Sequence, residues 1–232
     1  MMQPAHYQGL GELIPASPFR TDWIFIVTII PVVLFIVTSA IEHGNPSSLV
    51  KTVMSHRYAN TLFRGSGSSR QVILVPTWLM ILMSMSTFAW FFQVEYMFFP
   101  WDLRGIRLWM ADFAVITGAV IVRYMVSFIT GEISGNRELF REYMFNLFSY
   151  YKLLGIFLVV TNFLIPYLTV IPPLYLIASA SVLIGILYIL RTVRLVSIFI
   201  MGGFSLLYLI LYLCALEFTP ILIFIKYLSG TV

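Results

Sequence analysis

The sequence predicts an all-α membrane protein, a polytopic bundle of about six transmembrane helices with additional amphipathic cytoplasmic segments. Of its 232 residues, 60% are hydrophobic and 10% are charged, whereas a soluble domain carries about 25% charged residues. The apolar residues gather in runs of roughly 20, which is the length that a helix needs to cross a bilayer core of ~30 Å. None of these runs alternates polar and apolar residues as the strands of a membrane barrel do.

The first half of the chain contains three predicted spans. Residues 1–22 form an extracytoplasmic N-terminal segment, and a membrane domain of six spans follows over 23–228. The first span covers about 23–41 and opens with Thr-Asp-Trp. The second covers about 72–92 and carries a proline in its first turn, where a missing N–H costs least. The third covers about 108–130 and is the most polar of the set.

The second half adds three more spans. The fourth covers about 153–168 and the fifth about 173–190, with the short turn Thr-Val-Ile-Pro-Pro between them. This turn is so short and rigid that it predicts a tight hairpin. The sixth span covers about 203–225, and the sequence "RTVRLVSIFIMG" leads into it.

The distribution of Lys and Arg predicts the orientation of the bundle. The loops after the first, third and fifth spans hold nine basic residues, against four on the other side. Because basic residues collect on the cytoplasmic side, both termini are predicted to lie outside the cytoplasm.

Two stretches between spans have helical patterns of their own. Residues 47–64 place apolar and basic residues on opposite sides, which is typical either of a helix on an anionic leaflet or of a loop helix packed under the bundle. Residues 131–152 predict an elbow helix that leads into the fourth span, with three tyrosines at headgroup level. At the other side of the membrane, the segment 88–101, "FAWFFQVEYMFFPW", predicts an aromatic belt that anchors the chain or docks a partner.

The main candidate site is a carboxylate in the last span. Glu217 lies nine residues before Lys226, which places it ~13 Å below the outer end of the span, near mid-membrane. Pro220 frees a backbone carbonyl in the same turn, and Asn162 of the fourth span lies at a similar depth. Glu217 is therefore either a structural clamp on Asn162 or a group that changes protonation in a relay or an ion site.

The third span contains two further candidates, Asp112 and Arg123. They are eleven residues apart, so they share a helix face but are separated by ~16 Å and cannot pair with each other. Asp112 is expected near the outer surface, within reach of Arg104, Arg107 or Lys226. Arg123 is expected to extend towards the cytoplasmic interface.

No catalytic, cofactor-binding or metal-ligating motif is recognised in the sequence. The single cysteine, Cys214, falls in the last apolar run, and the three histidines lie outside the apolar runs with no metal-ligand spacing. Asp102, Asp112 and Glu142 are the weak candidates for an enzyme that acts on lipid at the interface. The expected partners are the lipid bilayer and membrane or periplasmic proteins, not nucleic acid.

Two motifs resemble a known family. "RTDWIF" at the start of the first span and "LYLCALEFTPILIFIKYL" at the end of the last are similar to an inner-membrane family of Bacteroidota, classed as domain of unknown function 4271. The likeness covers about residues 20–228. It implies a location in the cytoplasmic membrane and the recurrence of Glu217, Pro220 and Lys226 as a set. The family has no assigned activity, so it supplies no ligand or catalytic residue.

These observations favour a non-catalytic subunit or scaffold of a cell-envelope assembly. The first alternative is a small transporter or channel component that uses a polar notch formed by Glu217 and Asn162. The second alternative is a membrane enzyme that acts on lipid.

Overall fold

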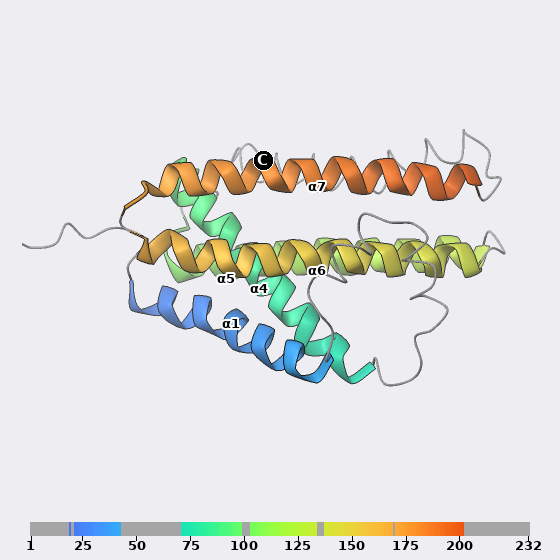
Figure 1. Ribbon diagram of the computed structural model, residues 1–232, viewed down its shortest axis with the longest axis horizontal. Coiled ribbons are helices and arrows are strands. Elements are labelled where there is room, and N and C mark those ends of the chain that lie inside the picture. Colours follow the sequence, from blue (N-terminus) through green and yellow to red (C-terminus); the bar gives the residue numbers. More distant parts are fainter. Residues whose placement is uncertain are drawn as a thin grey trace, which may run out of the picture.

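The computed structural model describes residues 19, 21–42, 71–98, 103–133, 137–168 and 170–201, and these residues contain five helices and no strand. The helices, shown in Figure 1, are α1 (Asp22–Glu42), α4 (Gln71–Glu95), α5 (Ile106–Ile133), α6 (Arg137–Tyr167) and α7 (Pro173–Met201). All five are long and apolar enough to cross a membrane. The all-α membrane architecture predicted from the sequence is confirmed.

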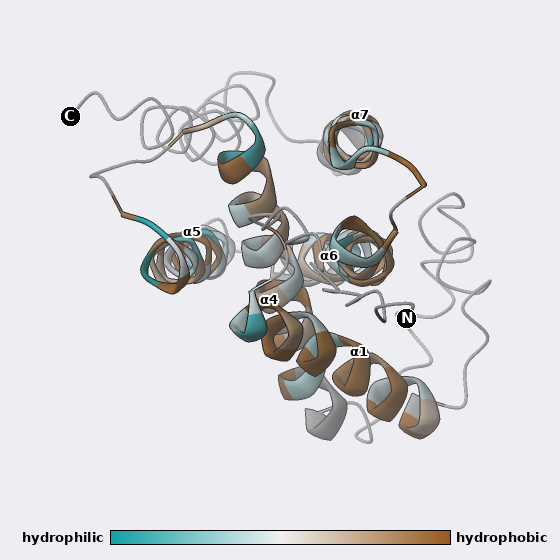
Figure 2. Cartoon of the chain, turned by 90° about the vertical axis from the view of Figure 1, so that its left-hand side faces the viewer, coloured by the Kyte–Doolittle hydropathy of each residue, from teal (hydrophilic) through white to brown (hydrophobic). Residues whose placement is uncertain are grey.

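Successive helices run in opposite directions, with α4 at the centre. Figure 2 views α5, α6 and α7 end-on, while α1 and α4 lie obliquely to them. Helix α4 packs against each of the other four described helices. In the most apolar part of α4, 61% of the residues are buried, compared with 11% in the corresponding part of α7.

The sequence of α4 explains how it tolerates a central position. Four of its hydroxyl side chains are buried, those of Thr77, Ser84, Ser86 and Thr87. Ser86 and Thr87 donate to the carbonyl oxygens four residues earlier, at 2.7 and 2.8 Å, so these hydroxyls need no partner from another helix. Small hydroxyl residues let neighbouring helices approach closely in a membrane.

Helix α6 packs tightly against α4 at Gly155. A Cβ atom added to Gly155 would lie 2.9 Å from Cγ1 and 3.3 Å from Cα of Ile81, which is itself fully buried. Glycine is therefore required at this crossing for steric reasons. The same addition at Gly118 of α5 or at Gly185 of α7 would meet nothing within 4 Å.

The apolar core consists of two clusters at opposite ends of the bundle. One surrounds the start of α6 and the end of α7 and includes Met80, Leu147 and Leu195. The other surrounds the connection from α4 to α5 and includes Phe91 and Leu158. The α4–α5 connection reverses direction through Met97 and Gly105, which have φ values of 56° and 60°. The left-handed value at Gly105, directly before α5, suits glycine.

Two helices extend further than the predicted spans. Helix α6 begins at Arg137, so the predicted elbow helix and the predicted fourth span form one helix of 31 residues. Its length of ~46 Å exceeds the ~30 Å of a hydrocarbon core. Helix α7 continues to Met201 through the segment that was expected to lead into the last span. No glycine or proline interrupts residues 137–152, and the apolar side chains of this stretch pack into the core.

Three predicted elements lie outside the described residues. They are most of the N-terminal segment 1–22, the amphipathic stretch 47–64 and the sixth span at 203–225.

Candidate functional site

An amide–carboxylate pair links α4 to α5 at the end of the bundle where the two helices connect. Gln93 Nε2 donates to Asp112 Oδ1 at 2.7 Å, and both side chains are 0% exposed. The sequence predicts that Asp112 lies within reach of Arg104, Arg107 or Lys226. Arg107 is exposed and Lys226 falls outside the described residues, so a basic partner for Asp112 stays a prediction; the described contact comes from Gln93. A buried acid next to a buried amide fixes the register of the two helices.

The aromatic belt predicted over 88–101 is partly an interior feature. Trp90 is 3% exposed and Phe91 is fully buried, and both contact Phe19 edge to face. Trp90 Nε1 donates to the carbonyl oxygen of Gly105 at 3.2 Å. Interfacial anchoring therefore does not describe these two rings, which join the end of α4 to the start of α5.

A second bond between α4 and α5 lies further along the helices. Trp109 Nε1 donates to Thr87 Oγ1 at 3.1 Å, and this hydroxyl in turn donates to the carbonyl oxygen of Met83. Both side-chain polar atoms of this pair of hydrogen bonds, Trp109 Nε1 and Thr87 Oγ1, therefore have partners. The indole thus crosses the interface without leaving a buried donor unsatisfied.

Asn162, the predicted partner of Glu217, contacts α4. Its Nδ2 atom donates to the backbone carbonyl oxygen of Ser84 at 2.8 Å, and the side chain is 3% exposed. Asn162 Oδ1 and Ser84 Oγ are buried with no hydrogen-bond partner among the described residues. This polar spot lies between α4 and α6. Glu217, Pro220 and Lys226 fall outside the described residues, so the pairing of Glu217 with Asn162 stays a prediction.

The side chain of Arg123 on α5 is buried inside the bundle. Its Nη2 atom donates to the phenol oxygen of Tyr143 on α6 at 2.9 Å, and its side chain is 7% exposed. The sequence predicts that this side chain extends towards the cytoplasmic interface, and the structure adds that it is enclosed between helices rather than exposed. The phenol of Tyr143 gives the guanidinium a buried acceptor that a lipid-facing position would lack.

The other two tyrosines of the predicted interfacial set are buried as well. Tyr150 and Tyr151 on α6 face the arginines of α7. The guanidinium carbon of Arg191 lies 5.2 Å from the ring centroid of Tyr151, and that of Arg194 lies 6.0 Å from Tyr150. These distances are within the range of cation–π attraction.

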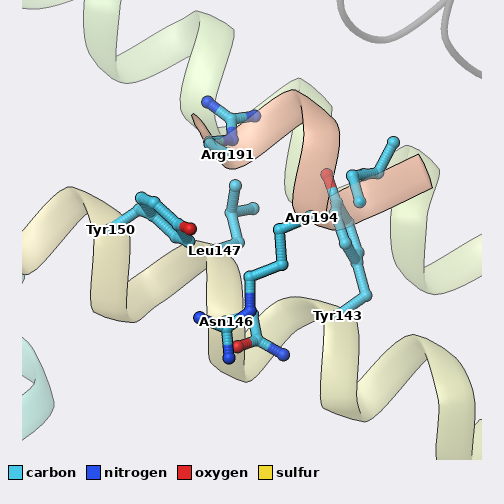
Figure 3. Close-up of a pocket in the computed structure, with 7 residues that line it drawn as sticks. Tyr143, Asn146, Leu147, Tyr150, Arg191 and Arg194 are labelled. Carbon is cyan, nitrogen blue, oxygen red and sulfur yellow. The ribbon is translucent and has the colours of Figure 1, made fainter. Parts of the chain in front are cut away.

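A small pocket lies between α6 and α7 beside these rings (Figure 3). It has about 10 Å³ of room for the centre of a water molecule, which is space for roughly one water. Arg194 extends from α7 towards Asn146 on α6 (Figure 3). The lining residues are Tyr143, Asn146, Leu147, Tyr150, Arg191, Arg194 and Leu195.

Sequence reasoning did not single out Gln93, Arg191 or Arg194 as site residues. Gln93 had a detectable signal, since it is an amide inside an aromatic run. The arginines were counted only as loop charges because α7 was expected to end at about residue 190. In the part of the chain that the structure describes, no group of three or more His, Cys, Asp or Glu residues could hold a metal ion.

Five apolar helices with hydrogen bonds between their buried polar groups define a multi-pass α-helical membrane protein. The family comparison narrows this class. A model of the family "Domain of unknown function (DUF4271)" matches residues 24–228, and the chain belongs to that family. No curated protein and no solved structure matches the chain.

Proposed function

We propose that the protein is a non-catalytic subunit or scaffold of an assembly in the cell envelope. The observation that carries this proposal is the use of buried polar side chains as links between helices. Gln93–Asp112, Trp109–Thr87, Arg123–Tyr143 and Asn162–Ser84 each join two different helices.

This pattern supports a structural role for the interior. A hydrogen bond between membrane helices contributes ~0.6–2 kcal/mol, and four such links hold α4, α5 and α6 in one arrangement. A rigid helix bundle is what a subunit needs in order to present fixed surfaces to neighbours. The partners that we propose are membrane or periplasmic proteins.

The proposed location is the inner membrane, with both termini outside the cytoplasm. The support is the excess of Lys and Arg in the loops after the first, third and fifth predicted spans. Reporter fusions placed at Ser66 and after Val232 should report opposite compartments. The same compartment for both would contradict the orientation.

The scaffold proposal is tested by isolating the full-length protein from its native membrane with a copolymer that retains surrounding lipid. We expect co-isolation of one or a few partner proteins at fixed stoichiometry, measured by native mass spectrometry. A Gln93→Leu variant, which removes the hydrogen bond to the buried Asp112 and loosens the α4–α5 link, should retain less partner than wild type. Recovery of the wild-type chain alone, at every protein concentration, would refute the proposal.

A transport component is the second candidate, and one observation favours it. Asn162 Oδ1 and Ser84 Oγ are two buried oxygens with no hydrogen-bond partner among the described residues. A protonated Glu217 at the depth predicted from the sequence would supply a donor for either oxygen.

The Glu217→Gln variant separates the two candidates, because it keeps the shape and a hydrogen-bond donor but cannot titrate. Normal growth with this variant would exclude a proton relay or ion site at Glu217. A defect confined to Glu217→Leu would support a structural clamp.

A further inference from the structure

The pocket between α6 and α7 brings arginines from two helices to one place. Arg191 and Arg194 line it directly from α7. Arg123 of α5 donates to Tyr143, which also lines the pocket, so a third guanidinium lies one hydrogen bond away. Arg191 and Arg123 are 8% and 7% exposed. The pocket is therefore lined or bordered by two buried guanidinium groups and the half-buried one of Arg194.

The chemistry of the lining suits a phosphate group. A guanidinium presents a planar fork of N–H donors that matches the oxygens of phosphate, and it loses less hydration on burial than an ammonium does. The amide of Asn146 and the phenols of Tyr143 and Tyr150 add polar groups around the same hollow. The pocket has space for about one water molecule, so it can accommodate one or two oxygens of a phosphate group but cannot enclose a whole metabolite.

The position of the pocket along the helices indicates where that anion comes from. The apolar parts of α6 and α7 cover Tyr143–Tyr167 and Pro173–Ser197, 25 residues each. At ~1.5 Å per residue these parts are ~37 Å long, which exceeds a ~30 Å hydrocarbon core. The pocket residues occupy the first two turns of the apolar part of α6 and the last two turns of the apolar part of α7. This position corresponds to headgroup depth in one leaflet.

An exposed hydrocarbon surface adjoins the pocket. Leu190, one helical turn before Arg194 on α7, is 49% exposed, and the preceding turn adds the exposed Ile186. Acyl chains can cover this surface while the headgroup reaches the arginines. Basic pockets between membrane helices bind anionic lipid headgroups in this way.

We propose that this pocket binds the phosphate group of an anionic membrane lipid in the leaflet at that end of the bundle. Arg194 and Arg191 hold the phosphate oxygens, Asn146 orients the headgroup, and the flank of α7 at Leu190 contacts an acyl chain. The proposal does not depend on the scaffold role.

The test is a lipid titration of the full-length protein in neutral detergent, followed by native mass spectrometry. Phosphatidylglycerol is the probe, and phosphatidylcholine with the same acyl chains is the comparison. We expect Arg194→Gln to weaken phosphatidylglycerol binding by about tenfold, since it removes a charge-assisted contact. The control is Arg107→Gln, which removes the same charge from an exposed position at the opposite end of the bundle and should bind as wild type does.

Three outcomes would overturn the proposal. The first is unchanged phosphatidylglycerol binding by Arg194→Gln, and the second is equal binding of phosphatidylcholine to the wild type. The third is displacement of the lipid by an equal concentration of sodium phosphate, which would show that free phosphate is the ligand. Because Arg194 is only half-buried, its variant is expected to fold even if Arg191→Gln does not.

Discussion

The replacement Gly155→Ala tests whether the crossing of α4 and α6 determines the stability of the bundle. The added methyl carbon would lie 2.9 Å from Cγ1 and 3.3 Å from Cα of Ile81. The first atom belongs to a β-branched side chain with one favoured rotamer in a helix, and the second is backbone. Neither can move aside locally, so α6 has to shift away from α4.

The expected cost follows from two opposing effects. Replacing glycine by alanine inside a helix stabilises it by about 0.5–1 kcal/mol. Forcing a methyl group into a well-packed core costs about 1–3 kcal/mol. Gly118→Ala and Gly185→Ala have the favourable effect alone, since a Cβ at either position meets nothing within 4 Å. The stability of Gly155→Ala is therefore predicted to fall about 1–3 kcal/mol below that of the two controls.

Thermal unfolding in detergent, followed by tryptophan fluorescence, measures this difference. At roughly 2–4 °C per kcal/mol, the midpoint of Gly155→Ala should lie about 2–12 °C below the controls. In an Ile81→Ala background the gap should shrink, because the clashing Cγ1 atom is absent. Equal midpoints for Gly155→Ala and both controls would refute the steric account of the crossing.

Two further predictions concern the polar links. Gln93→Leu should destabilise the protein by about 1–3 kcal/mol because it removes the hydrogen bond that Gln93 donates to the buried carboxylate of Asp112. A double-mutant cycle with Asp112→Leu should give a coupling energy of at least ~0.5 kcal/mol, and additive single effects would mean that the bond contributes nothing. Tyr143→Phe removes the oxygen that accepts a hydrogen bond from the buried Arg123 and should lower the midpoint of thermal unfolding. The control Tyr167→Phe, at an exposed position, should leave the midpoint within about 1 °C of wild type. Equal effects of the two variants would show that the phenol oxygen of Tyr143 does not contribute to stability.

The sequence alone predicts the membrane architecture well because hydrophobic length is a local property. Apolar runs of about 20 residues mark α1, α4, α5 and α7 close to their observed starts. The sequence predicted an elbow helix over 131–152 and a fourth span from about 153, but it did not predict that the two form the single helix α6, whose first sixteen residues are amphipathic and carry charge. Whether such a stretch bends away or continues depends on packing against α7, which no local pattern encodes.

The partners of the buried polar groups were the harder part to predict. Asn162 contacts a carbonyl 78 residues earlier, and Arg123 contacts a phenol 20 residues later, on the next helix. Sequence reasoning placed Arg123 at an interface because it treated α5 as an isolated helix in lipid. Tertiary packing supplies an acceptor for Arg123 inside the bundle, on Tyr143, which that treatment did not foresee.

The central position of α4 has a consequence for biogenesis. Its membrane-crossing segment is the least apolar and the most buried of the five described, and its Gln93 amide finds its acceptor on a helix that is synthesised later. Left alone in lipid, α4 would expose that amide and several hydroxyl groups to acyl chains. The nascent chain therefore reaches a stable arrangement only after the ribosome has completed α5 and α6, and insertion of this protein is expected to be cooperative over several helices rather than sequential.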